Sequence, residues 1–294
     1  MTIQWYPGHM QETEKFLKTA VSSVDVVLEI LDARLPVSSA NPLLDKICRD
    51  VFRIRLLNKK DMADPHVTGS WIDWYHKKDS PAVAVIGTDP ADTWRAVNLS
   101  LSGLKKAPSR RIRIMAAGIP NTGKSTIINT LAGKKIAKTG NTPAVTRHQQ
   151  RVGLKNRIDI YDTPGILWPV LENQKGACRL AVSGAISDAA LDYGDIVHFA
   201  LTILMERYPG SLEDRYGISL PESCREDSDS SGAVGADPGE ILERIGILRG
   251  CLKKGGIVDY KKTSELVIRE LRSGKLGRVS LETPDDIVSE KSEI

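Results

Sequence analysis

A phosphate-binding loop motif constrains this chain more than any other feature of its sequence. The residues Gly118-Ile119-Pro120-Asn121-Thr122-Gly123-Lys124-Ser125 follow a strand-like run and lead into a helix-like run that starts at Thr126. The two glycines allow backbone torsions and close approaches that a side chain would block, so successive N–H groups can turn inward around an anion. The lysine can then reach the outer phosphates, and the serine hydroxyl can bind a magnesium ion. The motif therefore predicts a nucleotide-phosphate site between a strand and a helix.

Length and composition predict a folded chain with one larger and one smaller domain. The chain has 294 residues, and its 41% hydrophobic content is enough to build cores. It has no apolar run near the roughly eighteen residues of a membrane span, and its first ten residues lack the features of a signal peptide. We therefore expect a cytoplasmic monomer without membrane contact. The four cysteines are scattered, so neither a disulfide framework nor a zinc site is indicated.

Strand-like and helix-like runs alternate in the first half of the chain. This pattern predicts an α/β domain whose mostly parallel sheet is covered by helices on both faces. The expected strands are 25–31, 51–57, 82–86 and 112–116, and the expected helices are 13–22, 42–49, 71–77, 93–104 and 126–131. Residues 134–145 should form a mobile loop, and 149–154 and 157–161 a hairpin.

The second half of the chain has a helical pattern. We expect helices within 171–205, 206–220, 241–252 and 260–271, which make a small all-α domain. The Ser-, Asp- and Gly-rich residues 222–238 should be a flexible loop. The expected units are an N-terminal segment (1–22), a nucleotide-binding domain (23–170), a basic helical domain (171–278) and a loose tail (279–294).

The tetrapeptide Asn58-Lys59-Lys60-Asp61 follows an apolar strand and predicts the base that is bound. The Asp61 carboxylate can accept hydrogen bonds from guanine N1–H and from its exocyclic amine, whereas adenine has no matching pair of donors. Asn58 would tie neighbouring loops together, and Lys59 would lay its aliphatic stem along the base. A tetrapeptide of this kind also occurs as a surface turn, but its place after a strand in a chain with a phosphate loop favours guanine.

A third motif, Asp162-Thr163-Pro164-Gly165, lies at the end of the second hairpin strand. Asp162 can hold magnesium through a water molecule, and the Gly165 N–H can meet the γ-phosphate. Thr146 is the preferred second hydroxyl ligand to magnesium, with Thr142 and Thr139 as competitors, and the turn Ile86-Gly87-Thr88 would contact guanine O6. The predicted nucleotide-binding residues are thus Asn58, Lys59, Lys60, Asp61, Ile86, Gly87, Asn121, Thr122, Gly123, Lys124, Ser125, Thr126 and Gly165, with Ser125, Thr146 and Asp162 as the magnesium ligands.

The order of these motifs differs from that in GTPases related to Ras, because the guanine-reading motifs come first. In this respect the chain resembles the circularly permuted GTPases. Within that group it is similar to the ribosome biogenesis GTPase A family, also called YlqF, from residue 1 to about 220 and more weakly beyond. The motifs that carry this resemblance are Trp5-Tyr6-Pro7-Gly8-His9-Met10, Asp32-Ala33-Arg34-Leu35-Pro36, Ser38-Ser39-Ala40-Asn41-Pro42, Asn58-Lys59-Lys60-Asp61, the phosphate loop, Asp162-Thr163-Pro164-Gly165 and Leu281-Glu282.

The resemblance implies a bacterial GTPase that binds the precursor of the large ribosomal subunit late in assembly and leaves after hydrolysis. It also implies a helical domain that contacts RNA, which agrees with ten Lys or Arg against five Asp or Glu between Glu240 and Arg278. A second basic run comprises Lys105, Lys106, Arg110, Arg111 and Arg113. The chain departs from the family at Ile86-Gly87, where a Ser-Ala-like pair is usual, and in the long acidic stretch 222–237.

Catalysis needs a group that orients the attacking water. Ile166 stands where Ras-like proteins carry Gln, and isoleucine cannot orient water. The resemblance assigns this role to His9, with Lys124 and Thr146 completing the catalytic set. Asn121 occupies the position that potassium-activated GTPases use, so it either holds a potassium ion or stabilises the loop. The two remaining candidates, His148 and His198, are expected to be structural.

Three other functions compete with this interpretation. In the first, GTP controls RNA binding with little catalysis, which Ile166 favours and His9 opposes. The second is a permuted GTPase that acts on the small ribosomal subunit, but such proteins usually add an N-terminal barrel or a Cys/His zinc module that this sequence does not show. The third is a small-molecule kinase, which would not need Asp61, so nucleotide preference separates it from a GTPase.

Overall fold

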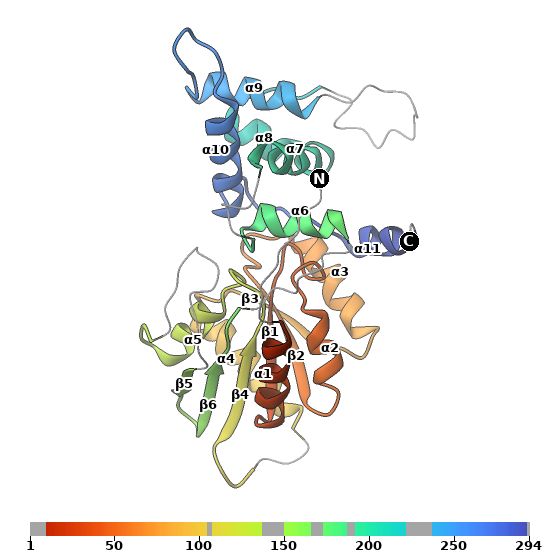
Figure 1. The fold of residues 1–294 in the computed structure, drawn as a ribbon, viewed down its shortest axis with the longest axis vertical. Coiled ribbons are helices and arrows are strands. Elements are labelled where there is room, and N and C mark those ends of the chain that lie inside the picture. Colours follow the sequence, from red (N-terminus) through yellow and green to blue (C-terminus); the bar gives the residue numbers. More distant parts are fainter. Residues whose placement is uncertain are drawn as a thin grey trace.

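The computed structural model describes residues 10–104, 108–136, 150–165, 173–186, 192–221 and 237–292. An α/β unit (residues 10–165) and a helical unit (residues 173–272) lie at opposite ends of the long axis of the molecule (Figure 1). The C-terminal residues run back between the two units, and α11 lies next to α6 (Figure 1).

Six strands form one sheet in the order β3-β2-β1-β4-β6-β5. They are β1 (Val26–Asp32), β2 (Phe52–Asn58), β3 (Ala82–Val85), β4 (Ile112–Ala117), β5 (Gln150–Gly153) and β6 (Ile158–Asp162). Every neighbouring pair is parallel except β5 and β6, which form the expected antiparallel hairpin. The prediction of a mostly parallel sheet is confirmed.

Helices cover both faces of this sheet. They are α1 (Met10–Ser22), α2 (Pro42–Ile47), α3 (Pro65–His76), α4 (Pro90–Ser102) and α5 (Lys124–Ala132). Alternate residues of β1 point to opposite sides, so Leu28 and Ile30 join the core under α4 and α5, whereas Val27 and Leu31 pack towards α1, α2 and α3. Burial of both faces explains why the strand is a nearly continuous apolar run.

An Asn-Pro or Asp-Pro pair opens three of these helices. The side chains of Asn41, Asp64 and Asp89 each accept a hydrogen bond from a backbone N–H in the first turn. The proline that follows is already set to helical φ and has no N–H to leave unsatisfied. For this reason α3 and α4 begin at Pro65 and Pro90, earlier than the apolar pattern predicted.

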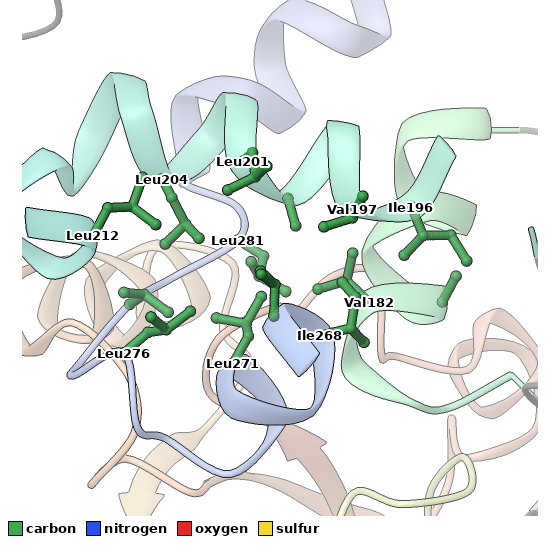
Figure 2. Close-up of a cluster of buried hydrophobic side chains, with 14 of the residues drawn as sticks. Val182, Ile196, Val197, Leu201, Leu204, Leu212, Ile268, Leu271, Leu276 and Leu281 are labelled. Atoms are coloured by element: carbon green, nitrogen blue, oxygen red, sulfur yellow. The ribbon is translucent and has the colours of Figure 1, made fainter. Parts of the chain in front are cut away.

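The helical unit has a core of its own. Its helices are α6 (Gln174–Ser183), α7 (Tyr193–Arg207), α8 (Pro209–Tyr216), α9 (Pro238–Leu248) and α10 (Tyr260–Arg272). Figure 2 shows α7 residues such as Leu201 and Leu204 facing Leu271 of α10 and Leu281 of the C-terminal segment. Two residues of the α/β unit, Leu35 and Ile119, belong to the same buried cluster. The two units therefore share one apolar interface.

The expectation of a loose tail from residue 279 is wrong. Val279 and Leu281 are buried, and α11 (Pro284–Ser292) follows them. The Leu281 N–H donates to the Arg34 carbonyl at 2.7 Å, and the Trp71 indole N–H donates to the Glu282 carbonyl at 3.2 Å. The segment lies in the seam between the two units and is part of the fold.

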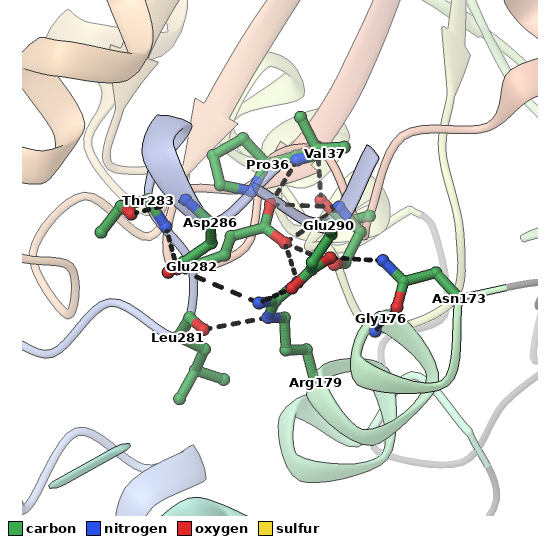
Figure 3. Close-up of polar contacts among 12 residues, drawn as sticks. Pro36, Val37, Asn173, Gly176, Arg179, Leu281, Glu282, Thr283, Asp286 and Glu290 are labelled. Carbon is green, nitrogen blue, oxygen red and sulfur yellow. Dashed lines mark hydrogen bonds and ion pairs between the residues drawn. The ribbon is translucent and has the colours of Figure 1, made fainter. Parts of the chain in front are cut away.

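The Glu282 side chain is the polar centre of this seam (Figure 3). Its carboxylate, which is fully buried, accepts hydrogen bonds from the backbone N–H groups of Val37 and Ser38 at 2.5 and 3.1 Å and from the Ser38 hydroxyl. The Arg179 guanidinium lies 3.5 Å away and also pairs with Glu290 at 2.6 Å. A buried carboxylate is tolerated because donors and a cation surround it.

In the part of the chain that the structure describes, we find no helix with the length and apolar character that crossing a bilayer requires.

Candidate nucleotide-binding site

The phosphate loop joins β4 to α5, as the sequence predicts. Gly123 is the N-cap of α5 with φ of 95°, in the left-handed region, and Gly118 has φ of 153°. A Cβ on Gly118 would lie 2.4 Å from the Ile30 carbonyl oxygen. The loop can pass this close to β1 only because the residue is glycine.

Lys124 opens α5 and turns back into the loop. Its ammonium group donates to the Ile119 carbonyl at 2.7 Å and is buried, and this burial lowers its pKa to about 8, although Asp162 opposes the shift. Gly165 is close by, since a Cβ there would lie 3.1 Å from the Lys124 nitrogen. The third motif therefore lies against the phosphate loop, with Asp162 buried at the end of β6.

Asn58, the last residue of β2, bridges two loops. Its side-chain NH₂ donates to the Thr122 carbonyl, and its oxygen accepts from the Gly87 N–H, both at 2.8 Å. The Thr130 hydroxyl holds the Gly87 carbonyl at 2.7 Å, and a Cβ on Gly87 would lie 2.7 Å from the Asn58 oxygen. A glycine at this turn lets the asparagine side chain approach the backbone.

The side chains of Lys59 and Lys60, the next two residues of the tetrapeptide, point to different partners. Lys59 has a positive φ of 63°, and its ammonium donates to the Asn121 carbonyl at 2.7 Å. Lys60 turns away to pair with Asp92 at 2.6 Å, and the same aspartate accepts from the Ile86 N–H at 3.0 Å. Asp61 is exposed.

Two oxygen-bearing side chains lie where magnesium was predicted. The Ser125 hydroxyl is in the first turn of α5 and is half-buried, and the Asp162 carboxylate is at the end of β6. Hard oxygen ligands of this kind fit Mg²⁺, which usually keeps several waters and binds through one or two protein groups and phosphate. Thr126 is also half-buried in the first turn of α5.

Asn121 makes a contact that the sequence did not predict. Its side-chain NH₂ donates at 2.6 Å to the carbonyl of Gly184, at the C-terminal cap of α6. The contact supports the loop-stabilising alternative and links the phosphate loop to the helical unit. The potassium role stays a prediction.

Several predicted residues lie outside the described residues, so their roles stay predictions. They are His9, Thr139, Thr142, Thr146, His148, Ile166, Lys105 and Lys106, together with residues 222–236.

Sequence reasoning gave no role to two residues that lie beside the site, although both belong to a motif that carries the resemblance. Asp32 ends β1 and is the register partner of Asn58, so its carboxylate reaches Lys59 at 2.8 Å, and Arg34 lies against the same carboxylate. The sequence did contain a signal for Asp32. It is an acidic residue at the carboxyl end of a strand, and the carboxyl ends of neighbouring parallel strands lie at one edge of the sheet, here beside the predicted guanine motif.

The fold and the gathered loops define a P-loop GTPase domain with permuted motifs. A family model described as "50S ribosome-binding GTPase" matches residues 113–200. The chain is 42% identical to ribosome biogenesis GTPase A of Priestia megaterium, over 97% of this chain and 98% of that protein. It is 31% identical to the protein of that name from Thermotoga maritima, over 99% and 98%.

Solved structures agree with this class. A GDP-bound structure of YlqF has a TM-score of 0.64 and 30% identity, covering 92% of this chain and all of that chain. A crystal structure of GNP-bound YlqF from T. maritima has the same TM-score, with 29% identity, covering 93% and 99%. The chain belongs to the ribosome biogenesis GTPase A family.

Proposed function

We propose that this GTPase acts in late maturation of the large ribosomal subunit, binding the precursor particle in the GTP state and leaving after hydrolysis. The observation that carries the proposal is the bridge made by Asn58, which joins the phosphate loop at Thr122 to the base-side turn at Gly87. This bridge connects the loop proposed to hold the phosphates to the turn proposed to contact the base, which supports a single nucleotide site. The names of the relatives supply the ribosomal context.

Within this proposal the nucleotide-binding motifs divide the tasks among them. Asp61 reads guanine, Lys59 lines the base, Lys124 binds the outer phosphates and the Gly165 N–H senses the γ-phosphate. Bound Mg²⁺, held by Ser125, Asp162 and Thr146, would neutralise phosphate charge. Neutral His9 would orient the attacking water. Slow intrinsic turnover is expected until the ribosomal particle orders the loops around the site.

The surface proposed to meet the precursor is at the end of the helical unit farthest from the nucleotide site (Figure 1). Five of the seven large hydrophobic side chains that are exposed in the described residues lie within 247–260, namely Ile247, Leu248, Leu252, Ile257 and Tyr260. Exposed lysines flank them at 253, 254, 261 and 262. Lysines attract the RNA backbone, and apolar and aromatic side chains can pack on bases or on ribosomal protein. We place this activity in the cytoplasm.

Sedimentation with purified large subunits, in GDP and in a non-hydrolysable GTP analogue, tests the proposal, with an ATP analogue as control. Co-sedimentation only with the GTP analogue is expected. In the same assay with GTP itself, the His9→Ala variant should stay on the particle while the wild type leaves. Equal binding in all nucleotide states, or no binding in any, would refute the nucleotide-controlled cycle. Turnover in potassium and in sodium, compared at equal ionic strength, tests the ion role of Asn121.

A further inference from the structure

The motif Asp32-Ala33-Arg34-Leu35-Pro36 has no task in the function described so far. It directly follows β1, at the sheet edge where the nucleotide motifs gather. Because β1 and β2 are parallel neighbours, Asp32 is paired in register with Asn58, and Lys59 comes next along the chain. The fold therefore places the Asp32 carboxylate beside the guanine motif.

The Asp32 carboxylate binds two cations at once. Its Oδ2 accepts from the Lys59 ammonium at 2.8 Å and from Arg34 Nη2 at 2.8 Å, while its Oδ1 accepts from Arg34 Nε at 2.9 Å. Its backbone is fixed as well, because the Asp32 N–H donates to the Ser39 hydroxyl oxygen at 3.0 Å. The arginine pair is bidentate, a geometry that fixes the orientation of the carboxylate.

These contacts are shielded from water. The relative exposure is 2% for Asp32 and 1% for Arg34, and the Lys59 side chain is 21% exposed. In such surroundings charged hydrogen bonds are short and strong, and an unpaired charge is costly. Arg34 binds both carboxylate oxygens, and Oδ2 also accepts from Lys59. The arrangement differs from a surface ion pair, which would contribute little.

The same lysine also touches the phosphate loop. Its ammonium donates to the Asn121 carbonyl at 2.7 Å, so it is held between the carboxylate of Asp32 and the backbone of the loop. A long, flexible side chain fixed at its tip has a fixed aliphatic stem. The stem is the part of Lys59 that would lie along the base.

We propose that Asp32 is a positioning residue of the guanine site, which holds Lys59 in place, and that Arg34 is the buried counter-charge that orients Asp32. The inference rests on the proposed guanine site at Asn58 to Asp61. It gives the motif a task in nucleotide affinity, carried out through Lys59 without contact with the nucleotide.

Arg34 also connects this pair to the helical unit. Its Nη1 donates to the Leu271 carbonyl of α10 at 3.3 Å, and its own carbonyl accepts from the Leu281 N–H at 2.7 Å. The residue that orients Asp32 is thus anchored in α10 and in the C-terminal segment.

The test uses the full chain and the double variant Asp32→Asn/Arg34→Met. Changing both residues avoids leaving a guanidinium buried without its carboxylate, and replacement of a buried pair by groups of similar volume is often tolerated. The dissociation constant for GDP is measured by titration with a fluorescent GDP analogue, and the thermal midpoint is measured separately. Lys59→Met gives the effect of losing the lysine itself. Ser38→Ala is the matched control, because Ser38 lies in the same loop as Asp32 and Arg34 and its hydroxyl donates to Glu282 of the C-terminal segment.

We expect the double variant and Lys59→Met each to weaken GDP binding about tenfold or more. The triple variant should be no weaker than Lys59→Met alone, because Asp32 acts through the lysine. Ser38→Ala should keep the wild-type dissociation constant. If Asp32 has only a structural role, the double variant should have a lower thermal midpoint and an unchanged affinity for GDP.

The outcomes separate this inference from the proposed site. Wild-type GDP affinity in the folded double variant, with Lys59→Met weakened, would overturn the role of Asp32 and leave the guanine site standing. Wild-type affinity in Lys59→Met would overturn the guanine-site assignment and this inference with it. If the double variant does not fold, Asp32→Glu keeps the charge and displaces the carboxylate by one methylene. Its affinity should then fall, and an unchanged value would refute the proposal.

Discussion

Replacement of Glu282 by alanine should destabilise the whole chain, although the residue lies in what the sequence presents as a polar tail. The carboxylate accepts two backbone N–H groups, from Val37 and Ser38, and the substitution leaves both without this acceptor in a buried place. An unsatisfied buried donor costs about 1–3 kcal/mol. Arg179 keeps its ion pair with Glu290 at 2.6 Å, so the loss of Glu282 removes only part of its counter-charge. The expected loss in the free energy of unfolding is about 3–5 kcal/mol.

For a chain of this size each kcal/mol shifts the thermal midpoint by about 2–4 °C, so Glu282→Ala should lower it by about 10 °C. Scanning calorimetry of the nucleotide-free protein at neutral pH measures this shift. Glu265→Ala is the matched control, because Glu265 is exposed on α10 and its loss should change the free energy of unfolding by less than about 0.5 kcal/mol. A shift in Glu282→Ala no larger than that of the control would refute the assignment of this carboxylate as the centre of the seam.

The Arg215 hydrogen bond holds the pKa of Glu270 at about 2, below its usual 4.5, so its stabilisation is complete above pH 4.5 and is lost as the pH falls towards 2. The thermal midpoint of the wild type should therefore fall more steeply than that of Glu270→Gln over this range, and parallel curves would contradict it. Burial lowers the pKa of Lys124 to about 8, and phosphate favours the charged form, so the dissociation constant for GDP should rise up to about tenfold per pH unit above pH 8. A flat profile between pH 8 and 9 would contradict the placement of this lysine. Gly87→Ala should weaken GDP binding about tenfold by displacing the bridging asparagine, whereas Gly69→Ala, which has open space around it, should not.

Hydrophobic patterns in the sequence predicted most helices and strands. Where a predicted helix start is wrong, the cause lies in the residues next to it. The apolar residues of α3 begin at Val67 and Trp71, but the helix begins at Pro65, because Asp64 caps a first turn that carries few apolar residues. The expected start at Trp71 followed hydrophobic periodicity alone. The Asp-Pro signal that marks the start of the helix was present in the sequence, at Asp64-Pro65 and again at Asp89-Pro90.

The tail was misjudged for a different reason. A glutamate followed by threonine, proline and two aspartates looks like exposed chain, and only the folded structure shows that the donors for Glu282 lie 244 and 245 residues away. A buried charge is stable where the fold supplies hydrogen-bond donors or a counter-charge. No pattern of neighbouring residues reveals partners so far along the chain. The same holds for Arg179, whose carboxylate partners come from the segment after residue 280.

The division into a nucleotide-binding domain and a helical domain follows the sequence pattern, but it is not a mechanical division. Ile119, in the phosphate loop, and Leu35, in the motif after β1, pack in the core of the helical unit. Asn121 bonds to the end of α6 and Arg34 to α10. Because packed interiors have few voids and transmit strain, a displacement of the phosphate loop has to move these contacts or strain them. In a GTPase whose role we propose to be nucleotide-controlled docking, this interface is where a change at the phosphates would reach the helical unit, which carries the proposed docking surface.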